Sequence, residues 1–184
     1  LHVHPTLING LTCGKGAQAL CEELLGREVL WIDICKPGYT LARLCFEKMN
    51  AYKEKYGKDV QVLLLQNHGI FVAANTVEEI GVLFDGVISK LEKQVRRTAD
   101  VSDAITPEKE QTAQKLSQLL GHAVEVVPVA EADNFAKDKT AAAPLLKPFT
   151  PDHIVYCGPY PLFVENIDQA KEALDAFMTE NDKE

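Results

Sequence analysis

"VQVLLLQNHGIFVAA", residues Val60 to Ala74, indicates two apolar strands joined by a tight turn. Leucine and β-branched residues fill both halves, so we predict strands over Val62 to Leu65 and Ile70 to Ala73. The polar Asn67-His68-Gly69 separates them, and Gly69 is expected to supply the permissive backbone of the turn. A histidine at such a turn is accessible to a ligand, although a polar turn residue that makes one backbone hydrogen bond would look the same.

The chain begins with LHVHPT, in which one residue separates His2 from His4. In an extended strand alternate side chains share a face, so the two imidazoles project from the same side. Two imidazoles on one face can share a metal ion, but this spacing also occurs at exposed strand ends. Because a catalytic zinc site usually takes three protein ligands and leaves a fourth position open, His68 is the candidate for the third ligand.

Apolar strands alternate with amphipathic helices over the first hundred residues, which predicts an α/β fold with one sheet. The run EVLWIDIC contains a further strand, Val29 to Ile34. We predict helices from Ala17 to Leu25, from Thr40 to Tyr56, and from a Thr76 cap with Glu79 three residues on to about Arg97.

The rest of the chain has weaker patterns. A helix from Pro107 to Leu120 is expected between the cap Thr106 and the stop Gly121. Beyond it we predict short strands at HAVEVVPV, PDHIVYCG and PLFVE, an irregular connection over residues 130–148, and a helix from Ile167 to Thr179. The expected domains are therefore residues 1–100 and a helical and mixed extension, residues 101–184, packed on the same domain.

Composition excludes several classes of protein. The chain has 184 residues, 46% of them hydrophobic and 25% charged, which is ordinary for a globular domain with a core. Its net charge of -8 opposes non-specific binding to nucleic acid or to an anionic membrane. The five cysteines form no C-x-x-C pair, and no apolar run approaches about 20 residues. We therefore expect free thiols, a cytoplasmic location, and neither nucleic acid nor a membrane as partner.

Three motifs, HVHPT, PGYTLA and LLLQNHGIFVAANTVEEI, occur in this order and at this spacing between Leu1 and Arg97. In this the sequence resembles the class II aldolase/adducin family, in which an H-x-H-P strand end and a later N-H-G strand end hold one zinc ion. The resemblance implies that His2, His4 and His68 bind Zn²⁺ or a similar divalent metal. It also implies a three-layer αβα domain around a central β-sheet, of which residues 1–100 form the C-terminal part and whose N-terminal part would precede Leu1.

The block FTPDHIVYCGPYPLFV, residues 149–164, resembles the long rhamnulose-1-phosphate aldolase type, which is often fused to a short-chain dehydrogenase. This likeness implies zinc-dependent cleavage of a ketose 1-phosphate, with rhamnulose 1-phosphate favoured, to dihydroxyacetone phosphate and an aldehyde. The expected partners are a small phosphorylated sugar and further copies of the chain, since the family forms tetramers. The alternatives are a pentulose-phosphate 4-epimerase and a non-catalytic adducin-like interaction module. Retention of all three histidines favours an enzyme.

The family's general base is a carboxylate that would precede Leu1, so no catalytic base is assigned within the chain. His153 is a candidate for a hydrogen bond behind a metal ligand, although a histidine at a strand edge explains it equally simply. Tyr39 and Asn67 are candidates for contact with substrate, and Tyr39 for contact with a neighbouring subunit. Glu28 and Asp33 precede or end a strand, where a carboxylate is usually solvated.

Overall fold

The computed structural model describes residues 1–102 and 104–181, and these form two compact units. The first unit comprises Leu1–Arg96 together with Phe149–Asp152. The second comprises Arg97–Pro148 and the residues from His153 onward. The sheet lies in the first unit, whereas the described part of the second unit contains helices and loops. That residues 101–184 pack on the first domain stays a prediction.

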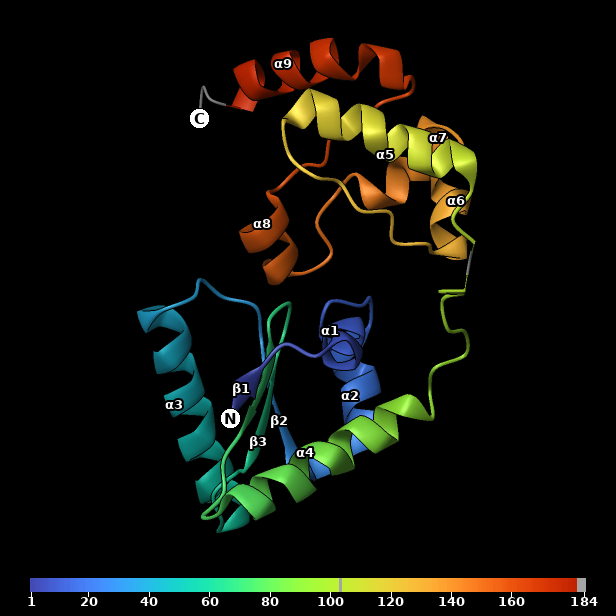
Figure 1. Cartoon of the computed structure of the whole chain (residues 1–184). Coiled ribbons are helices and arrows are strands. Elements are labelled where there is room, and N and C mark those ends of the chain that lie inside the picture. The colour runs from blue at the N-terminus through green and yellow to red at the C-terminus, as the bar shows by residue number, and fades with distance from the viewer. Residues whose placement is uncertain (103, 182–184) are drawn as a thin grey trace. The chain divides into compact units, whose positions relative to one another are not determined.

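One mixed sheet of four strands organises the first unit (Figure 1). Its strands lie in the order β1-β4-β3-β2. β2 runs parallel to β3, while β3 and β4 form an antiparallel hairpin and β1 pairs antiparallel with β4. The prediction that these segments share one sheet is confirmed, with the bounds β1 His2–Val3, β2 Val29–Ile32, β3 Val62–Leu65 and β4 Gly69–Val72.

The helices of the first unit follow the predicted pattern closely. Thr76 caps the last of them, because its Oγ1 accepts a hydrogen bond from the Glu79 N–H at 3.1 Å. The Glu79 carboxylate in turn accepts from the Asn75 N–H at 3.0 Å, so that two otherwise unpaired donors are satisfied. The helix ends at Glu92, earlier than predicted. The helices are α1 Thr6–Thr12, α2 Ala17–Leu25, the 3-10 turn η1 Gly26–Glu28, α3 Tyr39–Tyr56 and α4 Val77–Glu92.

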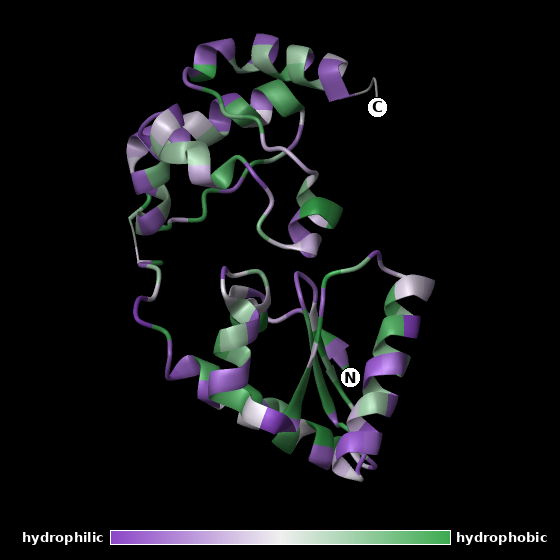
Figure 2. Ribbon diagram, turned by 180° about the vertical axis from the view of Figure 1, so that it is seen from behind, coloured by the Kyte–Doolittle hydropathy of each residue, from purple (hydrophilic) through white to green (hydrophobic). Residues whose placement is uncertain are grey.

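Alternate strand residues enter two hydrophobic clusters. Trp31, Leu64 and Ile70 pack with residues of α1, α2 and α4, whereas Ile32 and Leu65 pack with residues of α3. This is the two-residue periodicity of a strand whose side chains are buried on both faces. Figure 2 shows the apolar strands with helices whose colouring alternates between hydrophobic and hydrophilic. The chain therefore folds as α/β with a small mixed sheet, and the three-layer arrangement of the complete family domain stays a prediction.

The second unit confirms two predicted helices, Pro107 to Leu120 and Ile167 to Thr179, the latter as η3 followed directly by α9, and it corrects four other predictions. α5 spans Pro107–Leu120 with Thr106 as its cap and Gly121 as its stop. Residues 130–148 are not irregular, and the expected strands at residues 122–129, 151–158 and 161–165 are absent from the described residues. The remaining elements are α6 Ala130–Ala136, α7 Lys139–Ala142, η2 Ala143–Leu145, α8 Pro151–Cys157, η3 Ile167–Gln169 and α9 Ala170–Asn181.

The segment PDHIVYC forms a helix rather than a strand for identifiable reasons. Proline suits the first turn of a helix, where its missing N–H leaves no hydrogen bond unmade, and Pro151 begins α8. Asp152 lies in that first turn, where a negative charge interacts favourably with the helix dipole. An isolated apolar run becomes a strand only when another strand pairs with it, and the described part of this unit offers none.

The cysteines are free thiols, as their odd number indicated. Burial raises the pKa of the Cys21 thiol to about 11, so Cys21 is a core residue rather than a nucleophile. Within the described ranges, none of the helices has both the length and the apolar character needed to cross a bilayer.

Leu64 provides a test of the core, because it is fully buried in the central strand β3. Leu64→Ala should lower the free energy of unfolding by about 2–5 kcal/mol, since it leaves a cavity under the sheet. Leu20→Ala makes the same chemical change on α2 at a side chain that is 40% exposed, and it should cost less than about 1 kcal/mol. Urea unfolding followed by circular dichroism measures both, and equal losses would contradict this packing.

Candidate metal centre

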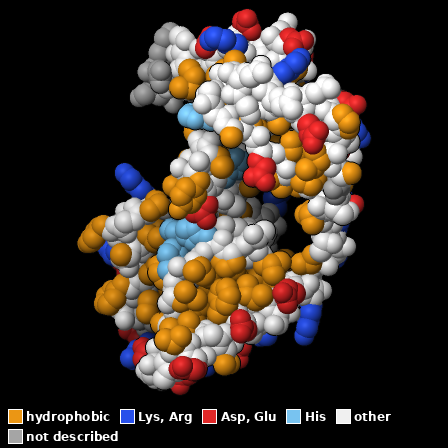
Figure 3. Space-filling view, viewed as in Figure 1, with side chains coloured by type: hydrophobic (Ala, Val, Ile, Leu, Met, Phe, Trp, Pro, Cys, Tyr) orange, Lys and Arg blue, Asp and Glu red, His pale blue; other side chains and the backbone are white. Residues whose placement is uncertain are grey.

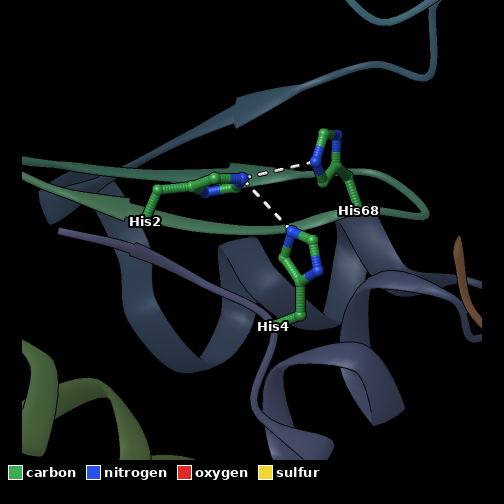
Figure 4. Close-up of side chains that lie close together, drawn as sticks. All are labelled: His2, His4 and His68. Atoms are coloured by element: carbon green, nitrogen blue, oxygen red, sulfur yellow. Dashed lines mark hydrogen bonds between the residues drawn. The ribbon is translucent and has the colours of Figure 1, made fainter. Parts of the chain in front are cut away.

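The imidazole rings of His2, His4 and His68 converge at one end of the sheet (Figure 4). His2 lies on β1, His4 follows β1 directly, and His68 lies in the turn between β3 and β4. The Nε2 atom of His2 is 3.2 Å from Nε2 of His4 and 3.3 Å from Nε2 of His68. All three rings place a nitrogen within 4.8 Å of the others. The structure thus brings together the three histidines predicted as metal ligands.

Hydrogen bonds on the far side of two rings fix which nitrogen carries the proton. His2 Nδ1 lies 3.0 Å from the carbonyl oxygen of Ile70, which can only accept, so Nδ1 donates. His4 Nδ1 lies 2.9 Å from each carboxylate oxygen of Asp152, which accept in the same way. In the neutral rings the Nε2 atoms of His2 and His4 therefore carry lone pairs that face each other.

This arrangement fits a tetrahedral divalent cation. Zinc binds imidazole nitrogen at about 2.0–2.1 Å, and tetrahedral angles then place two ligand nitrogens about 3.3–3.4 Å apart. Two of the three spacings, 3.2 and 3.3 Å between Nε2 atoms, match this value, and the ligand nitrogens of all three rings lie within 4.8 Å of one another. Facing lone pairs repel at such a distance unless a positive charge lies between them. The donor set, three neutral imidazoles, suits Zn²⁺ or a similar divalent metal and leaves one position of the ion open.

Backbone contacts hold the turn that carries His68. Asn67 adopts the left-handed conformation, with a φ of 55°, and its N–H donates to the carbonyl of Thr12 at the end of α1 at 3.0 Å. The His68 N–H donates to Leu65 O at 3.1 Å and closes the turn. The expectation that Gly69 supplies the permissive backbone is therefore wrong, because Asn67, a residue type that tolerates this conformation, does so.

Gly69 is instead required by the close approach of β1. A Cβ at this position would lie 2.5 Å from His4 Cδ2 and 2.6 Å from the carbonyl oxygen of Val3, well inside contact distance. Because Gly69 has no side chain, β1 can approach and pair with β4. In this pairing His2 stacks on Phe71 with ring centroids 4.0 Å apart. The missing side chain of Gly69 and the aromatic surface of Phe71 together position His2 on β1 and His4 directly after it.

The histidine cluster reaches the surface of the first unit, beside hydrophobic side chains (Figure 3). His68 is partly buried, and burial is the main reason why its pKa lies below the ordinary value of 6.5. The neighbouring rings of His2 and His4 lower this pKa further, and Asp152 acts in the opposite direction. A depressed pKa keeps His68 neutral near pH 7, which is the state that binds a metal.

The other predicted site residues have different surroundings. Asn67 acts through its backbone in the turn, and Tyr39, at the start of α3, is 81% exposed and makes no hydrogen bond to the three rings. His153 belongs to the second unit, so its role stays a prediction. Asp33 and Glu28 form ion pairs with lysines, as expected of solvated carboxylates.

Asp152 is the site residue that sequence reasoning missed. It lies next to His153 in the PDH motif, and with Phe149–Asp152 it groups with the first unit. The motif directed attention to the histidine, whereas the carboxylate beside it makes the hydrogen bond behind His4. An acidic residue directly before the candidate histidine was the available signal.

Comparison with known proteins supports the family for the first part of the chain. Residues 1–86 match the family model for the "Class II Aldolase and Adducin N-terminal domain". This matched range of the chain contains all three histidines of the cluster. The chain is also 23% identical over 77 residues to the "Uncharacterized oxidoreductase YuxG" of Bacillus subtilis (strain 168). That alignment covers 42% of this chain and 10% of the relative, so the chain spans about a tenth of that protein. No solved structure matches.

Gly69→Ala should disrupt the centre without replacing any of the three histidines. The added methyl group must displace β1 or the His4 ring, at a cost of about 1–3 kcal/mol, and zinc affinity should fall about tenfold or more. Gly81→Ala is the control, because a Cβ there meets no atom within 4 Å and alanine favours helix α4. Competition with a chromophoric chelator measures the affinities, and unchanged zinc binding by Gly69→Ala would contradict this reading.

The titration of His68 gives a prediction for the metal-free protein. Its pKa is depressed in the folded state, so the unfolded chain binds more protons between the two pKa values. His68 therefore contributes stability that is present above pH 6.5 and is lost as the pH falls through the folded-state value. Ring-proton NMR should show a His68 midpoint below 6.5, and a midpoint at or above it would be inconsistent with the burial described.

Proposed function

We propose that this chain carries the metal centre of a zinc-dependent sugar-phosphate aldolase that cleaves a ketose 1-phosphate to dihydroxyacetone phosphate and an aldehyde. The observation that carries the proposal is the convergence of three ring nitrogens, two of them with their lone pairs fixed toward one point. The match of residues 1–86 to the class II aldolase and adducin model supports the same chemistry. A 6-deoxyhexulose phosphate, rhamnulose 1-phosphate, is the leading substrate because of the block at residues 149–164.

The residues of this chain would bind and orient rather than transfer protons. His2, His4 and His68 would hold the metal, and as neutral ligands they leave its positive charge intact. A bound divalent metal stabilises the negative charge that develops on a ketose carbonyl oxygen during carbon-carbon cleavage. The Ile70 carbonyl and Asp152 would keep the proton of the His2 and His4 rings on Nδ1, which would leave each Nε2 free to bind the metal.

Proton transfer in a retro-aldol reaction also needs a general base. Asp152 hydrogen bonds to Nδ1 of His4, on the opposite side of the ring from the converging Nε2 atoms, so it is not placed to accept a proton from a metal-bound substrate. We propose that a carboxylate outside this metal centre acts as the base, as in the family that the sequence resembles.

Two alternatives make different predictions for the same protein. A pentulose-phosphate 4-epimerase would break and re-form the bond, so it would interconvert two pentulose phosphates without releasing an aldehyde. An adducin-like interaction module would turn over no sugar phosphate. The Bacillus subtilis relative is named an oxidoreductase, but the match covers only 10% of that protein. We therefore assign no dehydrogenase chemistry to these residues on the basis of that name.

The test is a retro-aldol assay of the natural full-length protein, coupled to reduction of dihydroxyacetone phosphate, on a panel of phosphorylated ketoses. His68→Ala should lose zinc and turnover together, with affinity reduced more than about 100-fold, since loss of an outer hydrogen bond alone costs 10- to 100-fold. His122→Ala, at an exposed histidine outside the cluster, should leave both unchanged. Turnover that persists in the presence of a chelator would overturn the proposal. So would the absence of turnover of every ketose phosphate by the zinc-loaded protein.

A further inference from the structure

Asp152 makes the longest-range side-chain contact of the metal centre. It lies 148 residues after His4, and both of its carboxylate oxygens lie 2.9 Å from His4 Nδ1. The two side chains are 23% and 39% exposed, His4 being the more buried. The geometry is that of one N–H shared between two oxygens of an anion, which is a charge-assisted hydrogen bond.

The surroundings of Asp152 are a built pocket rather than a chance surface contact. Phe149, Thr150 and Asp152 line a cavity together with His4, Asn9 and Cys13. All six residues belong to the first unit. The Asn9 side chain is almost completely buried and donates to the carbonyl oxygen of His4 at 3.4 Å, so both the backbone and the ring of His4 are held.

The rings of His2 and His4 differ in the group that accepts the hydrogen bond from Nδ1. A neutral carbonyl, that of Ile70, accepts from His2, whereas an anionic carboxylate accepts from His4. A carboxylate behind an imidazole fixes the tautomer and the ring orientation, and it also makes the opposite nitrogen a stronger ligand. An exposed ion pair, by contrast, contributes little to folding stability. The contact is therefore suited to the metal centre more than to holding the fold together.

We propose that Asp152 is a positioning residue of the metal centre, which keeps the proton of His4 on Nδ1 and directs the Nε2 lone pair at the ion. This inference rests on the proposed metal-dependent function. It gives the PDH motif a role: its aspartate completes the centre that the N-terminal histidines form. It also makes metal affinity depend on residues near the C-terminal end of the chain.

Asp152→Ala tests the inference through metal affinity. Zinc binding, measured by competition with a chromophoric chelator, should weaken about 10- to 100-fold, while the melting temperature of the metal-free protein stays the same. Asp59→Ala is the control, because it removes an exposed carboxylate that pairs with Lys53. A change in zinc affinity of less than about threefold in Asp152→Ala would overturn the inference. Asp152→Asn, which keeps the shape and removes the charge, replaces the alanine variant if that variant fails to fold.

A second measurement separates positioning from a merely structural role. The ¹⁵N chemical shifts of the His4 ring report its tautomer directly, and in the metal-free protein they should show the proton on Nδ1. In Asp152→Ala the ring should shift toward the Nε2–H form, and an unchanged tautomer would contradict the inference. Wild-type protein that binds no zinc would refute the proposed function, whereas wild-type binding with unaltered affinity in Asp152→Ala would refute only the role of Asp152.

Discussion

β1 pairs with β4 over a short register, His2 opposite Phe71 and Val3 opposite Ile70, and this pairing places two of the three metal-binding candidates. It depends on Gly69, because any Cβ there would strike Val3 and His4. The third histidine lies one residue before that glycine, in the turn. The same few residues thus join the strand to the sheet and bring the imidazoles within reach of one ion.

The hairpin could be predicted from the sequence because its signals are local. An apolar run, a polar tripeptide and a second apolar run specify β3, the turn and β4 without help from distant residues. The pairing of His2 with His4 followed from strand periodicity, and His68 from the need for a third ligand and from the family resemblance. The sequence did not predict which residue of the turn adopts the left-handed conformation, since both asparagine and glycine accept it; in the structure it is Asn67.

The strand predictions that failed lie within residues 122–165, where strand propensity misled. HAVEVVPV is rich in valine, and PDHIVYCG contains the run Ile154-Val155-Tyr156. Such propensity makes a strand only where a partner strand offers its backbone. In PDHIVYC the helix-starting proline and the following aspartate were the better guides. The role of Asp152 was hidden for a different reason: a contact across 148 residues leaves no periodicity and no local spacing in the sequence.

The proposed function requires that three imidazoles of this chain bind one ion. X-ray absorption spectroscopy of the zinc-loaded protein measures this directly, since imidazole ligands can be counted from their multiple-scattering signal. We expect one zinc ion per chain with three imidazole nitrogens at about 2.0–2.1 Å and an oxygen ligand in the fourth position. A first shell that contains sulfur, or fewer than three imidazoles, would contradict the account.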